Sequence, residues 1–200
     1  SKITKYLLHS ANRQLHIWDI NHPRNPSVVL DGPVFLNSSR YVLLSQSRAM
    51  IAGGVGQETS CVEVNVKTGS ITPLPPLLRA HKWHGMAVLR HAVYISGGDL
   101  SRAYARYAEK YEQGRWIEIA DMTIPRYNHT LCAYRSLVYA FGGCNKQDYQ
   151  DSIEYYNGSC WSVAAMKLPR PQNYSSVLSV KQGLLLVGGF RASNSDRSMD

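Results

Sequence analysis

Side chains suited to protein recognition gather in a few polar segments of this 200-residue chain. Tyrosine, tryptophan and arginine are the residue types that most often dominate the binding energy of protein interfaces. Our candidates for partner binding are Lys82, Trp83, Arg102, Tyr104, Arg106, Tyr127, Lys146, Tyr149 and Arg191. Their chemistry predicts aromatic contacts and charge-assisted hydrogen bonds to a protein, with an acidic peptide segment as the natural complement. The alternative is that they are ordinary solvated loop residues.

Residue spacings typical of catalysis are absent from the sequence. It contains no phosphate-binding P-loop, no HExxH zinc motif, no nucleophile elbow and no CxxC pair, and each of these chemistries needs its residues at a fixed spacing. Histidines His84 and His129 stand 45 residues apart, at equivalent places in a sequence repeat, where a shared structural hydrogen bond is the simpler role. We therefore predict no enzymatic activity, no bound metal and no cofactor.

The charge and the cysteines bear on the partner class and the compartment. Twenty-two Lys and Arg against fourteen acids give a net charge of +8, but the basic residues are scattered, which disfavours nucleic acid. The apolar stretches are too short to cross a bilayer. Four unpatterned cysteines are typical of reduced thiols in the cytoplasm, which is the expected location. Secretion is the alternative because four N-x-S/T triplets, which accept glycans only in secreted chains, begin at Asn37, Asn128, Asn157 and Asn173.

Glycine pairs show how the chain is organised. Eight of its fifteen glycines form four adjacent pairs, separated by 44, 45 and 46 residues. Each pair ends a short apolar run rich in β-formers, and a constant period in this range indicates a repeat architecture. The pairs are Gly53-Gly54, Gly97-Gly98, Gly142-Gly143 and Gly188-Gly189.

Further features recur within each period and predict four short strands. One apolar segment precedes the run that ends in the glycines, and a strand with a glutamate follows a polar loop. A tight turn, such as Asn157-Gly158, then leads into a fourth strand that closes near an arginine. The recurring residues are Glu63, Glu109 and Glu154, the aromatic residues Tyr111, Trp116, Tyr155 and Trp161, and the closing Arg79, Arg126 and Arg170. Four strands per 45 residues describe one blade of a β-propeller.

This pattern resembles the kelch repeat, in which a glycine pair precedes a Tyr, a Trp and a closing Pro-Arg. The resemblance implies an all-β, kelch-type β-propeller built of four-stranded antiparallel blades, and it covers nearly the whole chain. The copy around Gly53 departs from it, with Val64 and Ile71 where the aromatic residues belong. The WD40 propeller is disfavoured because Trp18-Asp19 is the sole WD dipeptide.

The phase of the repeat predicts an incomplete ring of about three full blades with a partial blade at each end. We expect a partial blade over residues 1–36, full blades over 37–79, 80–126 and 127–170, and a partial blade with a tail over 171–200. With strands labelled a to d from the axis outward, these contribute about seventeen strands. We therefore expect a fragment of a larger propeller, which at this period would need about six blades.

The resemblance also implies how the candidate residues are positioned. Because strands alternate in direction, the b–c and d–a loops share one end of the propeller, and a rigid scaffold that displays long loops is where binding concentrates. The recurring glutamates are expected to pair with the recurring arginines across blades. Kelch relatives recognise substrates for ubiquitin ligases or act in cytoskeletal and ciliary assemblies, so we predict a protein-interaction scaffold. The alternative is a kelch-fold enzyme, either a copper oxidase or a sialic-acid mutarotase.

Overall fold

The computed structural model describes residues 6–11, 14–19, 28–31, 38–100, 103–104, 106–145 and 148–190, and these contain strands but no α-helix. No helix in this part of the chain is therefore long and apolar enough to span a membrane. The strands are β1 (Tyr6–Ala11), β2 (Gln14–Asp19), β3 (Val28–Asp31), β4 (Arg40–Leu43), β5 (Arg48–Ala52), β6 (Cys61–Asn65), β7 (Ile71–Pro73), β8 (Gly85–Leu89), β9 (Ala92–Ser96), β10 (Asp99–Leu100), β11 (Ala103–Tyr104), β12 (Ala108–Glu112), β13 (Arg115–Ile119), β14 (Thr130–Tyr134), β15 (Leu137–Phe141), β16 (Ser152–Tyr156), β17 (Trp161–Lys167), β18 (Asn173–Val180) and β19 (Gly183–Phe190).

The strands form antiparallel sheets that follow the sequence repeat. Three sheets have four strands each, in the orders β4-β5-β6-β7, β8-β9-β12-β13 and β14-β15-β16-β17. A three-stranded sheet, β1-β2-β3, precedes them, and a two-stranded sheet, β18-β19, follows them. The short hairpin β10-β11 is an addition that the sequence did not indicate. Apart from this hairpin the described residues hold seventeen strands, and the predicted all-β fold with full and partial blades is confirmed.

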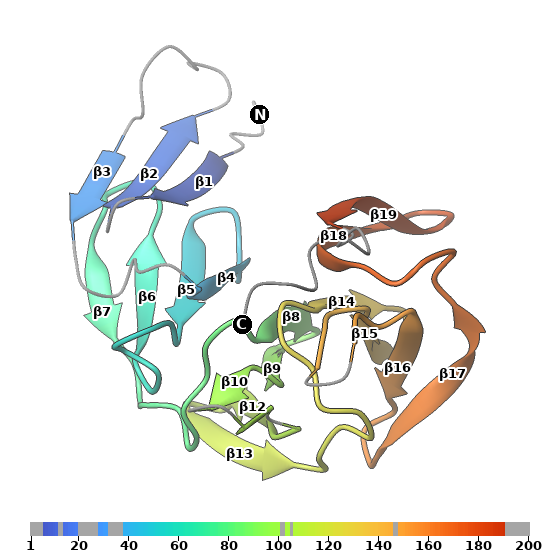
Figure 1. Cartoon of the computed structure of the whole chain (residues 1–200). Coiled ribbons are helices and arrows are strands. Elements are labelled where there is room, and N and C mark those ends of the chain that lie inside the picture. The colour runs from blue at the N-terminus through green and yellow to red at the C-terminus, as the bar shows by residue number, and fades with distance from the viewer. Residues whose placement is uncertain are drawn as a thin grey trace, which may run out of the picture.

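The sheets are arranged radially. Figure 1 shows the first strand of four successive sheets, β4, β8, β14 and β18, around a common centre, with β7, β13 and β17 on the outside. These four inner strands contact one another in that order. The sheets do not close into a ring within the described residues, as the phase of the repeat predicts.

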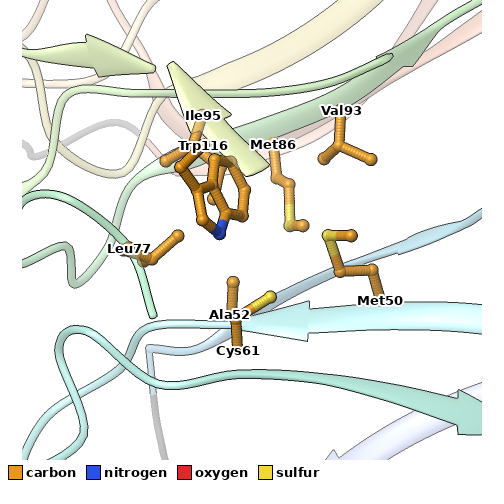
Figure 2. Packing of buried hydrophobic residues seen from close by; sticks show 8 residues of the cluster. All are labelled: Met50, Ala52, Cys61, Leu77, Met86, Val93, Ile95 and Trp116. Carbon is orange, nitrogen blue, oxygen red and sulfur yellow. The ribbon is translucent and has the colours of Figure 1, made fainter. Parts of the chain in front are cut away.

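Hydrophobic clusters fill the space between successive sheets. The cluster between the sheets that begin with β4 and β8 contains Met50, Cys61, Met86 and Trp116, all less than 10% exposed (Figure 2). Three further clusters occupy the other boundaries between neighbouring sheets. Burying one such side chain stabilises a fold by about 1.5–3 kcal/mol. The arrangement of the sheets therefore rests on face-to-face packing of apolar side chains.

The aromatic residues of the repeat lie at these boundaries, with one correction. Tyr111 pairs with Trp116 across β12 and β13, and Tyr156 pairs in the same way with Trp161 across β16 and β17. From the sequence, either Tyr155 or Tyr156 could take this position, with Tyr155 named among the repeat residues; the pairing selects Tyr156. Because successive side chains of a strand point to opposite faces, Tyr155 lies on the other face of its sheet, 6.1 Å from the ring of Tyr139.

Candidate protein interface

A chain of backbone hydrogen bonds links the sheets at the entrance to the inner strands. Four residues at equivalent places in the repeat form this chain, and all four have positive φ, from 52° to 73°. They are Ser38, Trp83, Asn128 and Tyr174. Trp83 N donates to Ser38 O (3.1 Å), Asn128 N to Trp83 O (2.8 Å) and Tyr174 N to Asn128 O (3.1 Å). This linked series was not predicted from the sequence, although its spacing of 45, 45 and 46 residues is close to the period of the glycine pairs.

The glycine pairs provide a second link between sheets. All eight paired glycines have positive φ, which glycine adopts without steric cost. The second glycine of a pair donates its backbone N–H to a carbonyl of the connection that leads into the next sheet. These bonds join Gly54 to His81 (2.9 Å), Gly98 to Arg126 (2.7 Å) and Gly143 to Gln172 (2.9 Å). His81, Arg126 and Gln172 therefore occupy equivalent positions.

Arg126 holds the two sheets on either side of it together. Its guanidinium is fully buried and donates to Gly142 O (2.7 Å), Ser152 O (3.0 Å) and Ser152 Oγ (2.8 Å) of the next sheet. Arg126 Nε also lies 3.5 Å from Glu154 Oε2, and Glu154 is equally buried. Burial raises the pKa of Glu154, and the charge of Arg126 opposes that rise. This is an arginine–glutamate pair across blades, as the family resemblance implies.

His81 takes the place of the arginine one sheet earlier. Its Nδ1 lies 2.8 Å from Gly97 O and its Nε2 lies 3.0 Å from Glu109 Oε1, with both side chains almost completely buried. These contacts reproduce those of Arg126 with Gly142 and Glu154. Glu109 therefore pairs with a histidine, and not with the side chain of a recurring arginine as the resemblance implies. The Arg79 side chain lies at the surface, where it pairs with Glu118 at 3.3 Å.

The remaining members of the expected series also depart from it. Glu109 and Glu154 each pair with the residue that stands two places before a glycine pair. In the sheet that begins with β4, the residue paired at this place is Val62, which is 7% exposed. Glu63 is one residue further along, on the other face of β6, where it accepts two hydrogen bonds from Arg48 at 2.6 and 2.5 Å. Arg170 is exposed, and Gln172 is the buried residue at the position of Arg126.

Two histidines lie beneath the connections that lead into the inner strands. His84 is 0% exposed and His129 is 2% exposed. Burial lowers the pKa of both well below the ordinary value of 6.5, and positive neighbours, including Arg40, add to the effect. His129 Nε2 lies 3.2 Å from Ser96 Oγ. Both rings are therefore neutral parts of the scaffold at pH 7.

Acidification is expected to destabilise the fold through these two histidines. Below pH 6.5 the unfolded state binds protons that the folded state does not, so the free energy of unfolding falls as the pH is lowered, by about 1.4 kcal/mol per pH unit for each histidine. Urea unfolding between about pH 7 and pH 5 should show a shallower decline for H129Q than for the unsubstituted protein. H91Q, at an exposed histidine, is the control, and a slope that H129Q leaves unchanged would contradict the assignment.

The b–c and d–a loops lie at the same end of the propeller, here called the loop end. Backbone hydrogen bonds join them directly, because Tyr127 and Cys144 exchange N–H to carbonyl bonds of 2.9 Å in both directions. His81 N likewise donates to Glu58 O (2.8 Å) and Gln172 N to Gln150 O (3.2 Å). The loops are thus tied to the strands and to one another.

Three of the candidate partner-binding residues form one cluster at the loop end. Lys82 Nζ lies 5.2 Å from the centre of the Trp83 ring. The Trp83 and Tyr127 rings, from successive d–a loops, lie 6.3 Å apart. All three side chains are partly exposed. The ammonium group beside the Trp83 ring can take part in cation–π contacts, and the two neighbouring rings can take part in stacking contacts.

The other candidates lie apart from this cluster or cannot be placed. Arg106 is exposed, and Tyr149 is half-buried in a β-bridge with Cys144. Tyr104 lies in the hairpin strand β11. Arg102, Lys146 and Arg191 lie outside the described residues. Within the ranges that the structure describes, no three His, Cys, Asp or Glu side chains gather as the ligands of a metal would.

Radial four-stranded sheets whose inner strands surround a centre define the class of this protein as a β-propeller. The sequence model of the kelch motif matches residues 125–165, the region that spans Arg126, Glu154 and Trp161. This part of the chain therefore carries a kelch motif.

Two curated relatives are similar to this chain in sequence, and one solved structure is similar to it in fold. The chain is 31% identical to human Kelch-like protein 23 over 121 residues, which is 57% of this chain and 22% of the relative. It is 31% identical to human Kelch-like protein 6 over 114 residues, which is 54% of this chain and 18% of the relative. The chain thus spans about a fifth of the length of these relatives. The solved structure of YjhT superimposes with a TM-score of 0.76 at 10% identity, over 92% of this chain and 73% of that one, and shows the shared fold.

Proposed function

We propose that this chain is a non-catalytic scaffold that binds a protein partner through the b–c and d–a loops at the loop end. The observation that carries the proposal is the cluster of Lys82, Trp83 and Tyr127, which is partly exposed and held on hydrogen-bonded loops. Aromatic side chains already held in place contribute binding energy at a small entropic cost. Lys82 and Arg106 add positive charge, so the proposed partner segment is acidic.

The relatives supply the proposed biological setting. Kelch-like proteins match more than half of this chain, and the family resemblance associates such propellers with substrate recognition by ubiquitin ligases and with cytoskeletal or ciliary assemblies. We assign this chain to one of these two kinds of role. In both, the propeller supplies the surface that selects the partner.

The proposed location is the cytoplasm. All four cysteines are free thiols, and burial raises the pKa of Cys61 to about 12, which keeps that thiol protonated. Two of the N-x-S/T asparagines, Asn128 and Asn173, are only 4% exposed and thus inaccessible to a glycan in the folded state. Asn157 is exposed, and Asn37 lies outside the described residues. These features suit a reduced, unglycosylated protein.

Substitution at the two ends of strand β8 tests the proposal. Residues Lys82 and Trp83 lie just before this strand at the loop end, and Arg90 and His91 lie just after it, in a turn at the opposite end. We expect K82A/W83A to reduce capture of partner proteins, measured by affinity purification and mass spectrometry, by at least about tenfold. R90A/H91A should capture the same proteins as the unsubstituted chain. Equal capture by K82A/W83A and the unsubstituted chain, with both folded by circular dichroism, would refute a role for the cluster.

A further inference from the structure

A cavity of about 280 Å³ lies between the sheets that begin with β4 and β8, at the end of the propeller opposite the loop end. Its rim includes the exposed residues Arg90 and His91, which form the turn between β8 and β9. Its inner wall is apolar, and Figure 2 shows the Met50 side chain pointing from its own sheet toward Val93 of the next. An apolar cavity of about 150 Å³ is enough to hold benzene, so this one has room for a substituted aromatic ring.

The repeat explains why this space is left. The residue three places before the glycine pair packs against the following sheet, and it is Met50 in the β4 sheet and Tyr94 in the β8 sheet. Tyr94 packs against Tyr156 of the following sheet, with the ring centres 6.0 Å apart. Met50 and the equivalent of Tyr156, which is Tyr111, both line the cavity, but a methionine has neither a ring nor a hydroxyl. The cavity therefore corresponds to the place that a phenol ring fills one boundary later.

An acceptor for a phenol hydroxyl lies in the cavity wall. Glu63 pairs with Met50 across β5 and β6, and both residues line the cavity. The Glu63 side chain is only 20% exposed, and among the described residues its hydrogen-bond donor is Arg48, at 2.6 and 2.5 Å. A carboxylate has about four acceptor positions. Glu63 can therefore accept a further hydrogen bond from a ligand.

The charges around the cavity favour a neutral ligand. Arg48 and Glu63 form an ion pair at 2.5 Å, so their charges compensate each other. The other arginine of the wall, Arg90, is exposed and therefore hydrated, and it adds little attraction for an anion. Burial raises the pKa of Tyr111, the charge of Glu63 adds to that rise and the charge of Arg48 opposes it, so the Tyr111 hydroxyl lies near both charges. A protonated phenol offers a donor to Glu63 and carries no charge that must be desolvated.

We propose that this cavity binds a small neutral phenol, with its ring between Met50 and Tyr111 and its hydroxyl donating to Glu63. The ring takes the place that Tyr94 occupies at the following boundary. The ligand is a free phenol because the cavity is large enough to enclose the whole molecule, whereas a tyrosine of a protein partner would also bring its backbone to the rim. The site goes beyond the proposed function, because it lies at the other end of the propeller and needs no protein partner.

Calorimetric titration with p-cresol and with 4-methylanisole tests the site. The two probes have nearly the same shape, but 4-methylanisole has no hydroxyl to donate. We expect p-cresol to bind the unsubstituted protein and 4-methylanisole to bind at least about tenfold more weakly. M50Y should fill the cavity as Tyr94 fills the equivalent space, and should weaken p-cresol binding at least about tenfold. M166Y places the same ring at a methionine that is 66% exposed, and should leave p-cresol binding unchanged.

A second measurement keeps the test independent of how well M50Y folds. In the unsubstituted protein with carbon-13-labelled methionine methyl groups, the NMR signal of Met50 should shift with p-cresol, and that of Met166 should not. No shift of the Met50 signal up to about 10 mM p-cresol, or equal binding of p-cresol and 4-methylanisole, would overturn the proposal. Tighter binding of a blocked Gly-Tyr-Gly peptide than of p-cresol would also overturn it, and would assign the site to a tyrosine of a protein partner. K82A/W83A should bind p-cresol normally, so a failure of the loop cluster to capture proteins would leave this result unaffected.

Discussion

Replacing Arg126 with methionine is expected to lower the free energy of unfolding by about 3–5 kcal/mol, because it leaves one partner of a buried ion pair uncompensated. Arg126 and Glu154 are both 0% exposed. The substitution also removes three hydrogen bonds that join one sheet to Gly142 and Ser152 of the next. Urea unfolding monitored by tryptophan fluorescence gives the free energy directly.

Two further variants identify the physical cause of that loss. R126M/E154Q should recover part of the stability, because neither charge remains buried. R79M removes an arginine whose ion pair with Glu118 is about half exposed on both sides, and its cost should stay below about 1 kcal/mol. The loss in R126M should also be smaller at about pH 5 than at about pH 8, since protonation of Glu154 neutralises the uncompensated charge. A loss that is equal in R126M and R79M would show that the buried pair contributes nothing particular.

Replacing Gly97 with alanine is expected to cost about 2–5 kcal/mol of folding free energy, the sum of a strained backbone and a steric clash. Gly97 has a φ of +64°, and a Cβ atom there would lie 2.5 Å from Arg126 O and 2.6 Å from His129 Cε1. Arg126 O already accepts the hydrogen bond from Gly98 N that links the two sheets. The added methyl group must therefore push apart the connection that the glycine pair holds.

The repeat itself provides the matched control for this substitution. Gly188 is the equivalent glycine of the last pair and has a similar φ of +70°, but no described atom lies within 4 Å of the place its Cβ would take. G188A should therefore cost only the backbone term, about 1–2 kcal/mol. Thermal unfolding of the two variants separates the terms, and equal losses would mean that close packing against the next sheet is unimportant at Gly97.

Much of this fold follows from the sequence because its signals are local. The glycine pairs have the positive φ that the turns require, and the turn at Asn157-Gly158 joins two strands as a hairpin signal predicts. A repeat of about 45 residues with an apolar run before each pair is enough to predict four antiparallel strands per blade. The hairpin β10-β11 was missed because it lies inside a polar loop without an apolar pattern.

The candidate site was predicted less completely, because its members meet only in space. The repeat predicts that Lys82, Trp83 and Tyr127 lie in d–a loops at the loop end of the propeller. The contact between the Trp83 and Tyr127 rings, however, depends on how two successive sheets pack.

The repeat is enough to predict the blade period, the strand order within a blade and the positions of the glycine pairs from the sequence alone. The packing of the sheets was needed to establish which of two adjacent residues lies at the boundary with the preceding sheet. At β6 this residue is Val62 and not Glu63, and at β16 it is Tyr156 and not Tyr155. The tertiary structure also decided that His81 replaces an arginine. The physical reason is the alternation of side chains along a strand, which makes a shift of one residue exchange the two faces. The loop from the glycine pair to strand c varies in length, so only the hydrogen-bonded pairing of the strands settles that register.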